Sequence, residues 1–364
     1  MSLVTDLFAP LAFARGAGMK NRFMLAPLTN CQSHDDGCLS DDEFRWLTLR
    51  AEGGFGLTMT CASHVQARGQ GFPGQLGVYS ERHVEGLTRL AAAIKTRDSV
   101  AMMQLHHAGM RAPAGLIGET PVCPSDNAET GARALALDEV KQLVDDFVTA
   151  AVRAERAGFD GVEIHGAHGY VISQFLSPEI NQRTDQYGGS PENRARLLFD
   201  IVAGVRASCR GDFVVGVRLS PERFGLRLVE IREVARQLLD GGAIDLLDLS
   251  LWDVFKEPEE AQFKGRSLMS YFTDLDRGAT RIGVAGKITS GEAARHCLET
   301  GADIAIIGRG AILHHDFPER VCTDPDFRAR ALPVTVEQLR AEGLGPAFVR
   351  YMQGWKGFVA DAAT

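Results

Sequence analysis

The chain alternates short apolar runs with segments whose apolar residues recur at the spacing of a helix. Eight of the apolar runs are nearly continuous, a pattern typical of strands buried on both faces of a parallel sheet. They span residues 22–27, 57–63, 100–106, 161–166, 213–220, 244–250, 282–286 and 304–309. Alternating strands and helices predict an α/β fold, and eight parallel strands close a barrel. We therefore expect residues 1–364 to form a single (β/α)8 barrel domain of the TIM type.

Helix start and stop signals support the segments between these runs. Ser40 and Glu43 fit a capping box, in which each side chain accepts a hydrogen bond from a backbone N–H of the first turn. Residues 138–157 place apolar side chains on one helical face, and Gly158 ends the pattern. Pro191 suits the first turn of a further helix, where a missing N–H has little effect.

Two segments do not fit a minimal barrel, and two others have an open role. Residues 1–21 precede the first strand and are expected to cap the N-terminal end of the barrel. Residues 108–137, rich in Gly, Pro and Ala, form a long loop after the third strand, where barrels build their active sites, and should contribute to the substrate entrance. Residues 251–258 either fold over the site or form a surface loop anchored by Trp252. An extension at about 325–364 either packs its aromatic side chains on the barrel or joins a subunit interface.

Composition and charge narrow the class of protein. The 364 residues carry a net charge of −8, which argues against a nucleic-acid partner or an anionic membrane surface. The seven cysteines are scattered without a CxxC pair, so neither a disulfide framework nor a metal module is expected. The N-terminus is too polar for a signal peptide, and no apolar run approaches the roughly 20 residues of a membrane span. These features predict a cytoplasmic protein.

Candidate chemistry gathers at the ends of the predicted strands. Polar, cationic and glycine residues stand there at Thr29, Gln104, His107, His165, His168, Tyr170, Arg218, Gly286, Lys287, Gly308 and Arg309. The ends of the seventh and eighth strands are where barrels often bind phosphate, since glycines let backbone N–H groups approach an anion closely. Turn glycines beside solvent-exposed basic residues remain the alternative. No GxGxxG occurs, so a Rossmann domain has no support.

His165 and His168 lie three residues apart just beyond the fourth strand. With Glu163 they could ligate zinc, although no further ligand cluster follows at a recognisable spacing. A structural role is the usual one for a lone histidine. Imidazoles can also donate hydrogen bonds to a substrate oxygen, and the nearby Tyr170 could then donate a proton.

These residues resemble the Old Yellow Enzyme family of FMN-dependent ene-reductases. The most specific match is the segment IHGAHGYVISQFLSPEINQRTDQYGGSPENRAR, which ends at Arg196. The resemblance continues along nearly the whole predicted barrel, through Asn21-Arg22, Ala26-Pro27, Gln104, His107-Ala108-Gly109, Val217-Arg218-Leu219-Ser220, Gly286-Lys287 and Gly308-Arg309.

The resemblance implies a bound FMN at the mouth of the barrel. The residues expected beside it are Ala26, Pro27, Leu28, Thr29, Cys61, Gln104, Arg218, Gly286, Lys287, Gly308 and Arg309. Gln104 would bond the pyrimidine edge of the flavin, because an amide is both donor and acceptor. Arg218 would stabilise the anionic reduced flavin and raise its potential. Thr29 stands where one branch of the family has cysteine, and Cys31 replaces an aromatic residue, which leaves that pocket wall open.

The resemblance also implies a reaction. NADPH or NADH would reduce the flavin, which would then pass hydride from N5 to the activated C=C bond of an α,β-unsaturated carbonyl compound, in ping-pong turnover. His165 and His168 would hold the carbonyl oxygen as it gains negative charge, and Tyr170 would protonate the α-carbon. A homo-oligomer with no membrane or nucleic-acid partner is expected.

Three alternatives remain at this point. The same scaffold could reduce nitro compounds, nitrate esters or quinones, because the histidine pair could hold those oxygens as well. A flavin-free aldolase or lyase barrel would require a Schiff-base lysine or a metal cluster, and neither stands out. A non-catalytic flavin-binding protein would have no evident use for His165, His168 and Tyr170.

Overall fold

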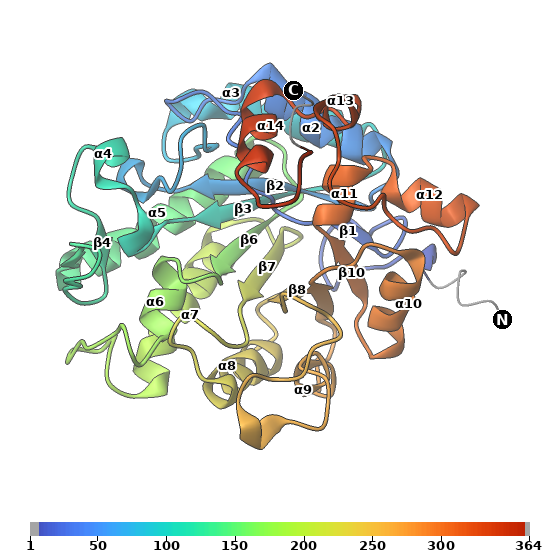
Figure 1. Cartoon of the computed structure of the whole chain (residues 1–364). Helices are drawn as coiled ribbons and strands as arrows, with labels where there is room; N and C mark the ends of the chain where they lie inside the picture. The colour runs from blue at the N-terminus through green and yellow to red at the C-terminus, as the bar shows by residue number, and fades with distance from the viewer. Residues whose placement is uncertain (1–6, 361–364) are drawn as a thin grey trace.

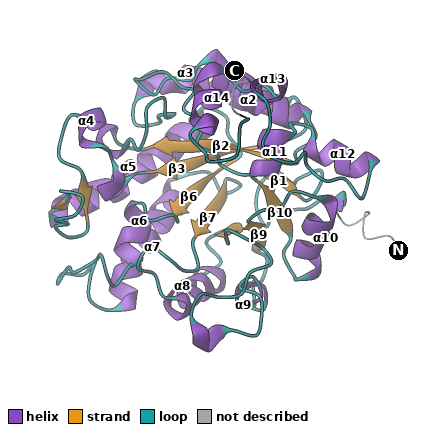
Figure 2. Ribbon diagram, viewed as in Figure 1, coloured by secondary structure: helices purple, strands orange, loops and turns teal. Residues whose placement is uncertain are grey.

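The computed structural model describes residues 7–360. Eight parallel strands close a barrel in the order β1-β10-β9-β8-β7-β6-β3-β2, with helices around it (Figures 1 and 2). The barrel strands are β1 (Phe23–Leu25), β2 (Leu57–His64), β3 (Val100–His106), β6 (Gly161–Gly166), β7 (Val214–Leu219), β8 (Leu246–Ser250), β9 (Arg281–Ala285) and β10 (Ile304–Ile307). The predicted (β/α)8 barrel is therefore confirmed, and all eight predicted runs are strands.

Thirteen helices lie within the described residues. They are α2 (Asp41–Glu52), α3 (Val84–Lys95), α4 (Ala114–Ile117), α5 (Leu137–Arg156), α6 (Val171–Leu176), α7 (Pro191–Ser208), α8 (Leu228–Asp240), α9 (Ser270–Thr273), α10 (Gly291–Glu299), α11 (Arg309–Leu313), α12 (Phe317–Thr323), α13 (Val336–Ala341) and α14 (Pro346–Gln353). Within residues 7–360, none combines the length and the apolar character that crossing a membrane requires.

The helix signals are confirmed with one correction. Gly158 follows α5 with a φ of +89°, and Pro191 begins α7. Ser40 caps α2 by accepting a hydrogen bond from the Glu43 N–H at 3.1 Å. The predicted capping box is wrong in its second half, because the Glu43 carboxylate is fully buried and is bound instead by Asn30 and Ser33.

The N-terminal end of the barrel is closed by the segment before β1. Leu11 and Met19 pair across this segment, with each N–H donating to the other residue's carbonyl oxygen. Leu11, Phe13 and Met19 pack in one apolar cluster with side chains from inside the barrel, among them Leu57 and Ile304. The prediction of a cap is thus confirmed for residues 7–21, and residues 1–6 lie outside the described part of the chain.

Candidate active site

The opposite end of the barrel holds a cavity of about 390 Å³. Each of the eight strands brings one residue to its lining, either from the strand or from the turn that follows: Ala26, Ala62, Gln104, His165, Arg218, Ser250, Ala285 and Gly308. Pro27, Leu28, Thr29, His168, Tyr170, Gly286, Lys287 and Arg309 line it as well. All the predicted site residues except Cys61 therefore line one cavity.

Cys61 does not line this cavity, and its neighbour Ala62 does. The register of β2 against β3 shifts between Met59 and Ala62, so the alternation of inward and outward positions changes within the strand. Cys61 packs into the core outside the barrel, where burial and then the nearby Glu43 carboxylate raise the pKa of its thiol. Sequence alternation alone could not locate this irregularity.

His165 and His168 form a connected pair in the cavity wall. His165 Nε2 lies 3.1 Å from His168 Nδ1, and His168 Nε2 lies 2.7 Å from the Ser250 hydroxyl. Burial, followed by repulsion from nearby cationic groups including Arg218, holds the pKa of both imidazoles well below its ordinary value. The two rings are therefore neutral near pH 7 and can offer N–H donors without adding charge.

Tyr170 stands beside this pair and is partly exposed. Its ring centroid lies 5.2 Å from that of His165 and 4.3 Å from that of His106, and the Arg111 guanidinium carbon lies 4.9 Å from the ring centroid. His106 is fully buried behind the cavity and was not assigned a role from the sequence. Tyr170 thus lies between the histidine pair and a cation, within one wall.

The zinc alternative is not supported by the placement of its ligands. Glu163 accepts a hydrogen bond from Gln104 Nε2 at 2.7 Å. Among the described residues, the group whose ligand atoms could hold a metal is elsewhere and includes neither His165 nor His168. His165 at the end of β6 and His168 just after it are available for substrate instead.

The opposite side of the cavity carries glycines and cations. Gly286 is required by packing, since a Cβ there would lie 2.6 Å from the backbone nitrogen of Asp253. A Cβ on Gly308 would meet only Leu28 and Ala26, which also line the cavity, at 3.7 and 3.9 Å. Lys287 Nζ forms an ion pair with Asp253 Oδ2 at 2.8 Å.

Arg309 differs from Lys287 in having no charge partner among the described residues. Its guanidinium makes no hydrogen bond or ion pair with any residue in the range 7–360, although it lines the cavity. An unpaired guanidinium beside a glycine turn is suited to a phosphate, which guanidinium binds through two parallel hydrogen bonds. This side of the cavity therefore fits the phosphate end of an FMN.

The floor of the cavity fits the other end of the cofactor. Gln104 and Arg218 reach it from β3 and β7. Gln104 Nε2 is bound to Glu163, while its Oε1 accepts no hydrogen bond from the residues described here. An open amide acceptor beside a guanidinium suits the polar edge of a flavin, and Ala26, Pro27 and Leu28 provide apolar surface for its ring.

Two walls of the cavity come from segments after the barrel strands. Trp252, which has a φ of +66°, lines the cavity. The guanidinium carbon of Arg223 lies over its ring, 4.6 Å from the ring centroid. The loop after β8 therefore borders the site through Trp252, whereas Phe255 is exposed and stacks on His296, so both predicted alternatives stay open. Tyr351, Met352 and Trp355 of the C-terminal extension also line the cavity, and none of the three was assigned to the site from the sequence.

The loop predicted to contribute to the substrate entrance lies outside the lining of the cavity. Residues 108–137 contain α4 and the two short paired strands β4 (Val122–Cys123) and β5 (Arg133–Ala134). None of these residues lines the cavity. Arg111 reaches the site only from behind, where it donates to the carbonyl oxygen of His168. That this loop contributes to the substrate entrance stays a prediction, and Tyr351, Met352 and Trp355 of the C-terminal extension line the cavity instead of it.

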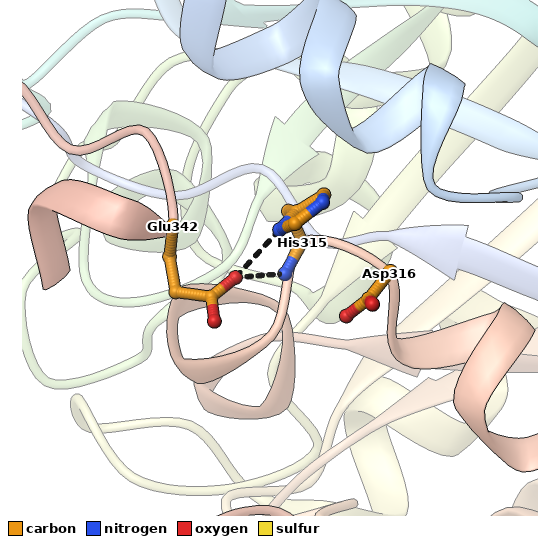
Figure 3. A group of neighbouring side chains, drawn as sticks. All are labelled: His315, Asp316 and Glu342. Carbon is orange, nitrogen blue, oxygen red and sulfur yellow. Dashed lines mark hydrogen bonds and ion pairs between the residues drawn. The ribbon is translucent and has the colours of Figure 1, made fainter. Parts of the chain in front are cut away.

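A cluster of charged side chains anchors the extension to the barrel (Figure 3). Glu342, at the end of α13, accepts hydrogen bonds from the N–H and Nδ1 of His315 at 2.8 and 2.6 Å and from Arg330 at 2.6 Å. Asp316 pairs with Arg320 at 2.7 Å. Burial raises the pKa of Glu342, but the bonds from His315 outweigh it and hold that pKa at about 2. The carboxylates are thus already engaged by cationic or N–H groups, and the cluster holds α13 and α14 beside the cavity.

Comparison with known proteins agrees with the site. A family model described as the NADH:flavin oxidoreductase / NADH oxidase family matches residues 6–325. The chain is 35% identical over 326 residues to the probable NADH-dependent flavin oxidoreductase YqiG of Bacillus subtilis (strain 168), covering 86% of this chain and 87% of that protein.

Solved structures extend the likeness to three dimensions. The Old Yellow Enzyme homologue from Zymomonas mobilis has a TM-score of 0.79 at 30% identity, over 92% of this chain and 96% of that one. A 2-naphthoyl-CoA reductase in complex with 2-naphthoyl-CoA has a TM-score of 0.80 at 26% identity, and this chain spans 52% of its length. The chain belongs to the NADH:flavin oxidoreductase / NADH oxidase family, that of the Old Yellow Enzymes, and is an FMN-dependent oxidoreductase that uses NAD(P)H as reductant.

Proposed function

We propose that this enzyme reduces the activated C=C bond of α,β-unsaturated carbonyl compounds. The observation that carries the proposal is the grouping of His165, His168 and Tyr170 in one wall of the cavity, with two neutral imidazoles beside a phenol. A substrate carbonyl requires hydrogen-bond donors, and the carbon next to it requires a proton donor. The three side chains supply both functions.

The residues of the site have distinct roles in this proposal. Gln104 and Arg218 bind the polar edge of FMN, Thr29 lies beside its ring, and Gly308 with Arg309 binds its phosphate. When bound, FMN supplies two-electron chemistry, because it can accept hydride from NAD(P)H and transfer hydride to an acceptor.

His165 and His168 orient the substrate and stabilise its oxygen. Their N–H groups donate to the carbonyl oxygen, and these bonds strengthen as the oxygen gains enolate character. Because both rings are neutral, this stabilisation comes from fixed dipoles rather than from a positive charge. Ser250, 2.7 Å from His168 Nε2, fixes the orientation of the second ring.

Tyr170 holds the proton that the α-carbon receives. Its hydroxyl group belongs to a ring that lies against His165, so a substrate bound to the histidines brings its unsaturated carbons near the phenol. The complex of the 2-naphthoyl-CoA reductase is consistent with this substrate class, since in 2-naphthoyl-CoA a carbonyl is conjugated with unsaturated carbons.

An anaerobic visible spectrum of the holoenzyme tests the proposal. NADPH or NADH should bleach the flavin band, and addition of cyclohexenone should restore it, with the saturated ketone as product. Cyclohexanone is the matched control and should leave the band bleached, because it has the carbonyl group without the activated double bond. A reduced enzyme that ignores several enones but is reoxidised by a nitro compound, nitrate ester or quinone would contradict the proposal and favour those acceptors.

A further inference from the structure

Four polar side chains on consecutive barrel strands meet at and beneath the floor of the cavity. Gln104 lies on β3, Glu163 on β6, Arg218 on β7 and Asp248 on β8, strands that Figure 1 shows side by side. Gln104 and Arg218 reach the cavity, whereas Glu163 and Asp248 have no exposed surface. Two carboxyl groups are therefore sealed beneath the two residues that we assign to the polar edge of FMN.

These side chains form a continuous chain of contacts. Gln104 Nε2 donates to Glu163 Oε1 at 2.7 Å, and Arg218 Nε lies 3.1 Å from Asp248 Oδ2. Glu163 Oε2 and both oxygens of Asp248 are buried, and the two carboxyl groups are close enough for the charge of Asp248 to act on Glu163. The contacts thus run from Gln104 through both carboxyl groups to Arg218.

This set of contacts leaves hydrogen-bonding groups unpaired if both carboxyl groups are ionised. Glu163 Oε2 and both oxygens of Asp248 then receive no well-aligned hydrogen bond from any described residue. Two ionised carboxylates are acceptors only, so they cannot bond to each other. A single proton on Glu163 removes most of this defect, because Glu163 Oε2 can then donate to one oxygen of Asp248 while Oε1 still accepts from Gln104.

The balance of charge also requires one proton. Within this cluster one guanidinium faces two carboxyl groups, and a second, uncompensated negative charge in a sealed site is strongly unfavourable. Burial, and then the charge of Asp248, raise the pKa of Glu163 well above its ordinary value. Burial also raises the pKa of Asp248, but the charge of Arg218 opposes that rise. His165 and His168, which both lie near Arg218, are neutral and add no positive charge.

We propose that Glu163 and Asp248 hold one proton between them, with the proton on Glu163, and that Glu163 is a positioning residue for the cofactor. Its Oε1 fixes the orientation of the Gln104 amide, so that Gln104 Oε1 faces the cavity as an acceptor for the imide N–H of the flavin. Asp248 alone balances the charge of Arg218. The inference rests on the proposed contacts of Gln104 and Arg218 with FMN.

Neutralising the carboxyl groups one at a time tests the shared proton. In Glu163→Gln the amide can donate to Asp248 and accept from Gln104, as the protonated acid does, so the midpoint potential and the FMN dissociation constant should match those of the wild type. In Asp248→Asn, Glu163 should ionise and replace the lost charge, again leaving the potential unchanged. The double variant should raise the potential, because Arg218 then has no counter-charge.

The opposite result would overturn the proposal. If both carboxyl groups are ionised in the native enzyme, Glu163→Gln alone removes a negative charge and should raise the midpoint potential. A potential that rises in each single variant, and rises further in the double variant, would therefore contradict a shared proton.

An infrared spectrum provides a readout that does not depend on the bound cofactor. The wild-type protein near neutral pH should show a carbonyl band of a protonated carboxylic acid, sensitive to H/D exchange. The part of this band that is due to Glu163 should disappear in Glu163→Gln and in Asp248→Asn, whereas any part due to the buried Glu43, whose pKa burial also raises, should stay in every variant. Lack of this band in the wild type would overturn the inference even if no variant folds. A band together with an unchanged potential in the double variant would support the proton but overturn the contact of Arg218 with FMN.

Discussion

The two ends of the barrel interior are built from the same strands but differ in chemistry. At the N-terminal end the inward side chains are apolar, and residues 7–21 cover them. At the C-terminal end five buried or nearly buried histidines follow or end the strands: His64, His106, His107, His165 and His168. The closed end consequently provides packing without chemistry, whereas the open end holds polar groups that a packed core would exclude.

The change from apolar to polar inward side chains occurs within single strands. On β8 the inward positions run from Leu246 in the apolar cluster to Asp248 and then to Ser250 at the cavity. On β3, Met102 is followed by Gln104 in the same way. Substitutions at the closed end should therefore alter stability, and substitutions at the open end should alter catalysis.

The largest effect is expected at the histidine pair. Replacing His165 and His168 together by Ala should slow enone reduction about a thousandfold or more, because each transition-state donor contributes roughly a hundredfold. Phenol binding should weaken in a spectral titration, while FMN stays bound. Unchanged affinity for phenols and enones would contradict the assigned role of the pair.

Shortening a buried side chain at the closed end should lower stability and leave catalysis unchanged. Ile304 is fully buried in the apolar cluster, and Ile304→Ala should lower the free energy of unfolding by about 2–5 kcal/mol. Denaturant unfolding of the holoenzyme measures this loss. Enone kcat should remain at the wild-type value in the folded fraction, and a large loss of kcat would break the separation between the two ends.

Tyr170→Phe should separate the two half-reactions. Loss of the proton donor should slow reoxidation by an enone about a hundredfold, in line with general acid catalysis. Reduction by NAD(P)H should change little, because that step needs no proton from Tyr170. Stopped-flow measurement of each half-reaction tests this prediction, and equal slowing of both would argue against a proton donor.

Glu342→Gln should loosen the cavity wall without touching the reacting groups. The amide keeps only one accepting oxygen, and its NH2 group would face either the His315 or the Arg330 donors, so stability should fall by about 1–3 kcal/mol. KM for a bulky enone should rise more than kcat falls, because Tyr351 and Trp355 lose their support. Arg320→Gln, which removes the Asp316 pair, is the matched control and should have a smaller effect.

Acid should lower the stability of the protein through buried histidines at the open end, such as His64. Burial lowers the pKa of His64 to about 4, whereas an unfolded histidine titrates near 6.5, so the unfolded state binds the proton more readily. The stability that this group confers is present above about pH 6.5 and is lost as the pH falls toward about 4, by roughly 1–2 kcal/mol at pH 5. Unfolding measured at pH 7 and pH 5 should show a smaller difference in His64→Phe, whereas Ile304→Ala should keep the wild-type difference.

The sequence was sufficient for much of the fold because local patterns report burial directly. Nearly continuous apolar runs located all eight barrel strands, and Gly158 and Pro191 marked helix boundaries. The lining of the cavity could be anticipated because the ends of parallel strands converge at one end of a barrel. Cys61 was misplaced because a register shift in β2 reversed the faces of neighbouring residues.

Contacts between distant segments were decided only by the tertiary structure. Whether residues 108–137 or the C-terminal extension borders the cavity depends on packing and on the His315–Glu342–Arg330 anchor, which no local pattern encodes. The pairing of Glu163 with Asp248 is likewise invisible along the chain, because the two lie on different strands and acquire their shared environment only when the barrel closes. The sequence by itself determined the strands, the helices and the chemical types at the strand ends, since these depend on local periodicity. The neutral histidine pair, the sealed carboxyl groups and the cavity wall required the closed barrel, since burial and charge proximity are properties of the folded chain.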